Sequence, residues 1–152
     1  MRNFLVKSIA TVLGVGYLPV APGTWATIVG VAIAYFLGDY LPIYTILLLV
    51  LLVLGIMTTG VMEKLLDQKD PSVACIDEVV GVMIALWHVS PLIWPVMICG
   101  FFLFRAFDMF KIYPINKLEA LPGGWGIMLD DCMAGVYTNI ILHIAMRCAG
   151  FF

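Results

Sequence analysis

Five carboxylates stand where apolar segments of the chain begin or end. They are Asp77, Glu78, Asp108, Asp130 and Asp131. Carboxylates at membrane depth are energetically costly, so they are candidates for a functional site by default. Each acid alone could simply be solvated at a helix end. That interpretation weakens for five acids with cations interspersed among them.

Two cations flank one of these acids at regular spacing. If the segment is helical, Arg105, Asp108 and Lys111 follow one another at i, i+3 and i+6 and lie on roughly one face. A surface ladder of ion pairs would have the same spacing. The functional alternative is that Asp108 holds a metal while Arg105 and Lys111 bind phosphate oxygens, Arg as a bidentate fork and Lys as a point charge.

The adjacent pair Asp130 and Asp131 follows a glycine-rich stretch at 122–126 and is expected to precede the last helix. Acids at a helix start also favour the helix dipole, which is the simpler explanation. Neighbouring carboxylates repel each other, however, and a hard divalent cation relieves that repulsion. Oxygen ligands without a His or Cys cluster indicate Mg²⁺ rather than zinc. The metal-ligand candidates are therefore Asp77, Glu78, Asp108, Asp130 and Asp131.

Thr24 follows Pro22 and Gly23, at the expected start of a helix that runs to about Leu37. The free amides of a helix start attract phosphate, so Thr24 is a candidate for substrate binding or catalysis. It could equally well serve only as the helix cap. Several other chemistries are excluded because the chain has no Gly-x-Ser-x-Gly elbow, no phosphate-binding P-loop and no cysteine-phosphatase loop. Metal-assisted hydrolysis by water remains.

The composition places this chemistry in a membrane. The chain has 152 residues, of which 63% are hydrophobic and 12% charged, whereas soluble domains carry about 25% charged residues. The net charge of -2 and the absence of a basic run argue against nucleic acid as a partner. Residues 41–62 are uncharged and long enough to cross the hydrocarbon core, which is about 30 Å thick.

The uncharged segment 79–104 decides whether the acids can meet. It is interrupted by Pro91 and Pro95. If it doubles back, all but one of the eight Lys and Arg residues, Arg147, fall on the same side. The positive-inside tendency favours that arrangement. We therefore predict an all-α, polytopic membrane helical bundle with short helices broken by Pro and Gly, and a re-entrant or hairpin segment at 79–104.

Together these motifs resemble those of the phosphatidylglycerophosphatase A family, in the family's order, over residues 14–138. The matching stretches are Gly14-Val15-Gly16-Tyr17-Leu18-Pro19, Ala21-Pro22-Gly23-Thr24-Trp25, Asp77-Glu78-Val79-Val80-Gly81, Phe104-Arg105-Ala106-Phe107-Asp108 with Lys111, and Gly123-Gly124-Trp125-Gly126-Ile127-Met128-Leu129-Asp130-Asp131. Each stretch alone is weak, and the set is specific.

The resemblance implies Mg²⁺-dependent hydrolysis of phosphatidylglycerophosphate to phosphatidylglycerol and phosphate, in phospholipid biosynthesis at the bacterial inner membrane. We expect residues 1–152 to form one integral-membrane phosphatase domain with its site facing the cytoplasm and a phospholipid as substrate. In this interpretation the metal ligands and one general base are supplied by Asp77, Glu78, Asp108, Asp130 and Asp131. The rival interpretation is a small proton- or ion-coupled transporter that uses the same carboxylates.

Overall fold

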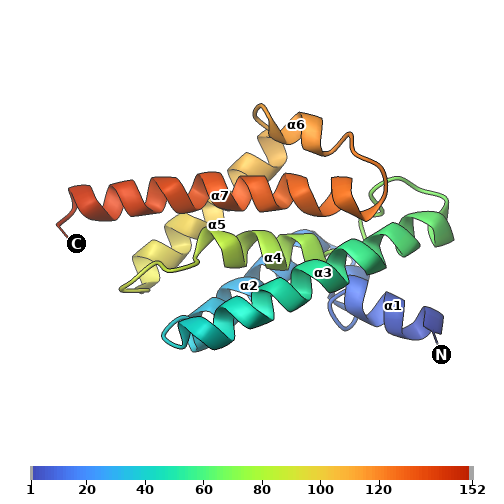
Figure 1. Ribbon diagram of the computed structural model, residues 1–152, viewed down its shortest axis with the longest axis horizontal. Coiled ribbons are helices and arrows are strands. Elements are labelled where there is room, and N and C mark those ends of the chain that lie inside the picture. The colour runs from blue at the N-terminus through green and yellow to red at the C-terminus, as the bar shows by residue number, and fades with distance from the viewer. Residues whose placement is uncertain (1, 151–152) are drawn as a thin grey trace.

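A computed structural model describes residues 2–150, which form helices and no strands. The elements are α1 (Arg2–Ala10), the short 3-10 helix η1 (Val15–Tyr17), α2 (Pro22–Leu37), α3 (Leu41–Leu66), α4 (Ile76–Ala85), α5 (Trp94–Phe110), α6 (Ile115–Leu118) and α7 (Gly124–Cys148). The predicted all-α class is confirmed. Figure 1 shows that α4 lies in the middle of the bundle, where it contacts α2, α3, α5 and α7.

Two helices, α3 and α7, are long and apolar enough to cross a bilayer. The predicted apolar span at 41–62 corresponds to α3, which continues to Leu66. Only 22% of its most apolar window is buried inside the molecule, so most of that window faces outward. An apolar helix with this exposure suits a lipid environment better than water.

Helix α2 begins earlier than its sequence suggests. Pro22 occupies its first turn after Ala21, whose φ is 48°, so Thr24 lies inside the helix and does not cap it. The expectation that the helix restarts with Thr24 as its cap was wrong, because a proline, which lacks an amide hydrogen, fits the first helical position. Small residues on one face of α2 allow close packing against α4. A Cβ at Gly30 would lie 2.9 Å from the Val79 carbonyl oxygen.

The segment between the acids of α4 and the cations of α5 doubles back. Helix α4 is mostly buried and ends at Ala85, residues 86–93 form a turn, and α5 begins at Trp94. As a result the first turn of α4 lies next to the last turns of α5. Helices α4 and α5 are thus joined as a helical hairpin. That this hairpin enters and leaves a membrane on the same side, as the charge distribution favours, stays a prediction.

The last helix also begins before its predicted start. We expected Asp130 and Asp131 to precede it, but α7 already begins at Gly124, so both acids lie inside the helix. Glycine makes this possible because a Cβ at Gly124 would overlap the carbonyl of Ile56 in α3. Contact with α3 thus fixes the helix start well before the apolar residues that suggested it.

Candidate active site

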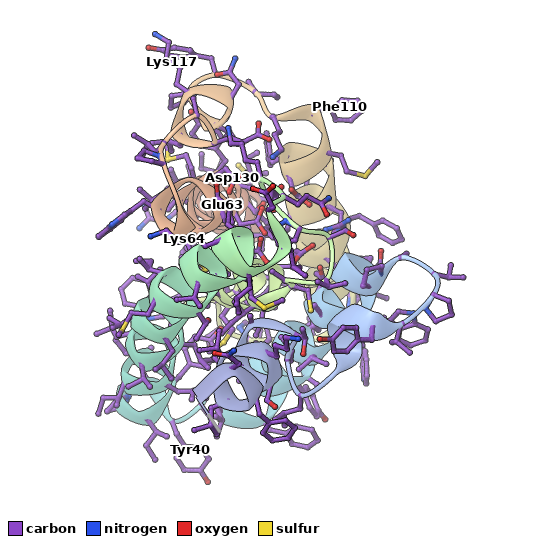
Figure 2. The ribbon with its side chains drawn as sticks, turned by 90° about the vertical axis from the view of Figure 1, so that its right-hand side faces the viewer. Tyr40, Glu63, Lys64, Phe110, Lys117 and Asp130 are labelled. Atoms are coloured by element: carbon purple, nitrogen blue, oxygen red, sulfur yellow. The ribbon has the colours of Figure 1, made fainter. Side chains whose placement is uncertain are left out.

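A polar cavity of about 290 Å³ opens at the end of the bundle where α4 begins and α5 ends. Its walls bring together segments from the whole chain: Ala21, Pro22, Gly23, Asp70, Ser72, Ala74, Asp77, Glu78, Arg105, Asp108, Lys111, Asp130 and Asp131. Asp130 is buried, and Figure 2 shows it among other oxygen-bearing side chains, with Tyr40 at the opposite, lower edge of the view. The structure thus brings together all five predicted acids and both predicted cations.

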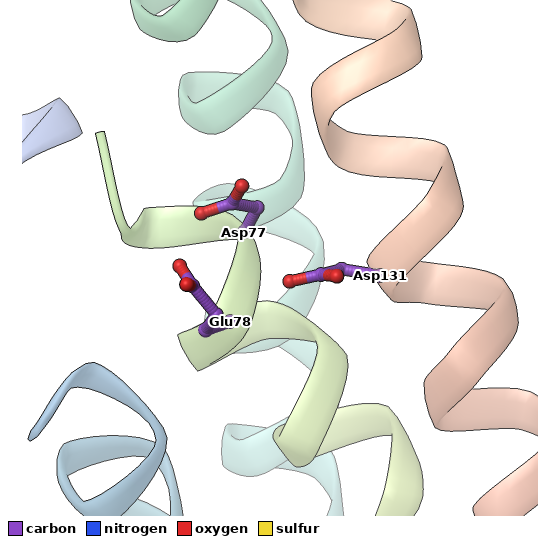
Figure 3. Close-up of side chains that lie close together, drawn as sticks. All are labelled: Asp77, Glu78 and Asp131. Atoms are coloured by element: carbon purple, nitrogen blue, oxygen red, sulfur yellow. The ribbon is translucent and has the colours of Figure 1, made fainter. Parts of the chain in front are cut away.

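Three of the acids form the centre of this cavity. One carboxylate oxygen each of Asp77, Glu78 and Asp131 lies within 4.8 Å of the others (Figure 3). Asp77 and Asp131 are only 7% and 3% exposed. One oxygen on each of the three side chains is buried and has no hydrogen-bond partner among the described residues. We call Asp77, Glu78 and Asp131 the acidic cluster.

Burial disfavours the charged form of the acidic cluster. Burial raises the pKa of Asp77 well above its usual range, and the neighbouring charges of Glu78 and Asp131 raise it further. Buried, unpaired carboxylate oxygens carry a large desolvation penalty unless a cation or a proton compensates them. Hard oxygen ligands of this kind suit Mg²⁺. The residues present therefore fit the divalent cation expected from the sequence.

Arg105 lies beside the acidic cluster. Its Nη1 donates to Oδ2 of Asp108 at 2.7 Å and lies 3.7 Å from Oε1 of Glu78. The i, i+3 relationship within α5 produces the first contact, as the spacing predicts. Asp108 thus orients the guanidinium toward the cavity, and the remaining N–H groups can bind an anion.

Lys111 approaches the same cavity by a different route. It is the C-cap of α5, with a φ of 44°, and so leaves the helical face of Arg105 and Asp108. Its Nζ lies 2.8 Å from Oδ2 of Asp130 and 3.0 Å from Oε1 of Glu119. Burial alone lowers the pKa of Lys111, but the hydrogen bonds and charges of these two acids outweigh burial and raise it. The ammonium is therefore firmly protonated.

Asp130 differs from its neighbour Asp131 in its partners. One of its oxygens accepts from Lys111, and the other accepts from the backbone amide of Asp131 at 2.9 Å. Both oxygens are thus engaged, whereas one oxygen of Asp131 has no partner among the described residues. The two adjacent acids therefore have different surroundings, which their sequence positions do not reveal.

The start of α2 closes one side of the cavity through its backbone. A Cβ at Gly23 would overlap the Glu78 carboxylate and lie 3.4 Å from Nη1 of Arg105. Thr24 is not among the residues that line the cavity. Its amide donates to the carbonyl of Ala21 at 3.0 Å, so only its hydroxyl could serve a ligand. The predicted role of Thr24 stays a prediction.

Three polar residues near the cavity were missed from the sequence. Asp70 and Ser72 line it from the loop between α3 and α4, and Glu119 contacts Lys111 from just after α6. The sequence offers one indication for Asp70 and Ser72, which is that they belong to the polar stretch just before Asp77. That signal does not separate them from ordinary solvated loop residues.

Sequence comparisons match this chain to known proteins. The sequence model of the family described as Phosphatidylglycerophosphatase A matches residues 8–146. A Bacteroides thetaiotaomicron protein described as a candidate phosphatidylinositol-3-phosphatase is 38% identical, with 94% of each chain covered. The phosphatidylglycerophosphatases A of Haemophilus influenzae and Escherichia coli are 34% and 30% identical, over 90% and 89% of this chain and 86% and 80% of their own. No solved structure gives a significant match.

Proposed function

The chain belongs to the phosphatidylglycerophosphatase A family, and from this premise we propose that it hydrolyses phosphatidylglycerophosphate to phosphatidylglycerol and phosphate with the help of Mg²⁺. The single observation that carries the proposal is the polar cavity. It combines a buried acidic cluster, which a divalent cation would stabilise, with Arg105 and Lys111, which suit a phosphate. Neither half alone would indicate a phosphomonoester.

Asp77, Glu78 and Asp131 would hold the metal. When bound there, Mg²⁺ supplies charge neutralisation at the phosphate and lowers the pKa of a coordinated water. Magnesium usually takes only one or two protein carboxylates. The third acid of the cluster is then free to accept the proton of the attacking water, as the general base of the reaction.

The two cations bind the phosphate oxygens. Arg105 presents its planar fork from α5, held by Asp108, while Lys111 presents a point charge held by Asp130 and Glu119. In this assignment Asp108 and Asp130 position the cations, although the sequence also suggested them as metal ligands. The hydroxyl of Thr24 is a further, weaker candidate for contact with the phosphate.

We also propose that the cavity faces the cytoplasm at the bacterial inner membrane, where the product would enter phospholipid biosynthesis. Helices α3 and α7 would cross the bilayer, with the α4–α5 hairpin entering from the side of the site. The cations support this orientation. Lys64, Lys69, Lys111 and Lys117 belong to the end of the bundle that carries the cavity, whereas Arg147 is near the end of α7.

Phosphatidylinositol 3-phosphate is the second candidate substrate, because the Bacteroides relative carries the corresponding name. Both lipids present a phosphomonoester to the same cations, so the cavity suits either headgroup. The transporter interpretation is less favoured, because the acids gather with cations in one cavity at a bundle end instead of forming a path between two faces.

Purified protein in detergent, supplied with each lipid in turn, tests the proposal. Phosphate release should require Mg²⁺, and its kcat/KM should be higher for phosphatidylglycerophosphate than for phosphatidylinositol 3-phosphate. The reverse preference would assign the second substrate. Absence of release from both lipids with any divalent metal would refute a phosphatase of this kind.

A further inference from the structure

One continuous segment of the chain separates the polar cavity from an apolar pocket. Residues 21–23 line the cavity, and the residues on either side of them line the pocket: Leu18, Pro19, Val20 and Trp25. This pocket has a volume of about 430 Å³. Although its side chains are large and apolar, they are well exposed: Val20 is 71% and Trp25 50% exposed. We call it the Trp25 pocket.

The two compartments lie on opposite sides of α2. An α-helix turns about 100° per residue, so Gly23 and Trp25 point roughly 200° apart. Gly23 is buried against Glu78 and Arg105, while Trp25 belongs to an outward apolar face that continues to Ile28 and Phe36. A ligand that occupies both compartments must therefore pass over the start of the helix, at Ala21 and Pro22.

A phosphate-bearing ligand with a long apolar part fits this pair of compartments. Its phosphate would face the cations of the cavity, and its methylene groups would leave water for the apolar pocket. A sugar phosphate or a nucleotide has no apolar part to place there. The contiguity of the two compartments along residues 18–25 thus favours a diacyl lipid over a water-soluble phosphate.

We propose that the Trp25 pocket receives an acyl chain of the lipid whose phosphomonoester lies in the polar cavity, and that the lipid reaches the site over the first turn of α2. This inference rests on the proposed lipid phosphatase function. It makes Trp25 and Val20 determinants of substrate class, because they distinguish a membrane lipid from its free headgroup. The outward face of α2 would guide the remainder of the chain.

Kinetics with two substrates tests this role. We measure kcat/KM for diacyl phosphatidylglycerophosphate in mixed micelles and for its deacylated, water-soluble headgroup. The readout is the kcat/KM of the diacyl lipid divided by that of the headgroup. Trp25→Ala should lower this ratio about tenfold, since loss of one aromatic contact surface is worth about one decade. Val20→Asp, which puts a charge into the pocket, should lower it in the same way. Trp94→Ala is the matched control, because Trp94 is 66% exposed but lies at the start of α5.

An unchanged ratio in both Trp25→Ala and Val20→Asp would overturn the proposal, as would an equal drop in Trp94→Ala. The equal drop would mean that any exposed tryptophan matters to micelle binding. If the wild-type protein releases phosphate from neither substrate, the proposed function fails. A binding experiment then tests separately whether the Trp25 pocket binds an acyl chain.

That binding experiment uses phosphatidic acid with a photoreactive diazirine in its acyl chain, a lipid phosphomonoester. After illumination, mass spectrometry should find the label on residues 18–28, and excess unlabelled phosphatidic acid, but not phosphatidylcholine, should remove it. Labelling that is equally strong along the exposed face of α3, or that is insensitive to phosphatidic acid, would contradict a specific acyl pocket.

Discussion

Nη1 of Arg105 lies 3.7 Å from Oε1 of Glu78, although one residue belongs to the first turn of α4 and the other to the last turns of α5. The α4–α5 hairpin thus places the guanidinium of Arg105 beside the acidic cluster. In the proposed mechanism, a phosphate bound by Arg105 would lie close to a metal bound by Asp77, Glu78 and Asp131.

Replacing Arg105 should remove much of the transition-state stabilisation. We expect Arg105→Ala to lower kcat/KM about 100- to 1,000-fold, as for loss of one donor that faces developing charge. Arg105→Lys should recover only part of the loss, because Lys lacks the bidentate fork. Arg147→Ala, in the last turn of α7, is the control and should behave like the wild type. Phosphate release that is equal in Arg105→Ala and the control would remove Arg105 from the site.

Lys111 and Asp130 should be coupled in stability but not in activity. Lys111→Met leaves Asp130, which is buried, without its cation and should cost about 1 to 3 kcal/mol in the free energy of unfolding. Adding Asp130→Asn should recover much of that stability, but not phosphate release, because the phosphate still lacks its point charge. Denaturant titration and turnover of the two single variants and the double variant measure both effects. Purely additive stabilities would contradict the pairing.

Two glycines of α2 should respond differently to alanine. In Gly23→Ala the new Cβ would overlap the carboxylate end of the Glu78 side chain. This side chain can shift without moving the backbone, so the substitution disturbs the acidic cluster and leaves the fold intact. We expect kcat/KM to fall about 10- to 100-fold with little change in stability. In Gly30→Ala the Cβ meets the Val79 backbone, so α2 must move away from α4, at a cost of about 1 to 3 kcal/mol in stability. Equal effects of both variants on turnover and on stability would mean that Gly23 is only a packing position.

Much of this arrangement could be predicted from the sequence, because charge is scarce in an apolar chain. The uncharged runs predicted helices, which the structure confirms. The distribution of Lys and Arg predicted that segment 79–104 returns to the side of the membrane that it left, and this stays a prediction. Both predictions depend on the cost of placing charge in lipid, which is large compared with local preferences.

The details that failed depend on where individual helices begin and end. Lys111 was expected on the face of Asp108, but α5 stops at Phe110 and directs Lys111 to Asp130 and Glu119. Asp130 and Asp131 were expected before α7 and lie within it, because contact between Gly124 and α3 sets the helix start. Such ends are decided by tertiary contacts and by single left-handed residues, which local spacing does not encode.

Counting bound metal ions tests the central claim most directly. Mn²⁺ can replace Mg²⁺ as a paramagnetic probe, and electron paramagnetic resonance reports free and bound ions during a titration of the purified protein. The wild type should bind Mn²⁺ in competition with Mg²⁺, and so should Asp39→Asn, whose substitution lies at the far end of the bundle between α2 and α3. Asp131→Asn, although folded, should lose that binding together with phosphate release. Wild-type Mn²⁺ binding in Asp131→Asn would contradict a metal site built on Asp77, Glu78 and Asp131.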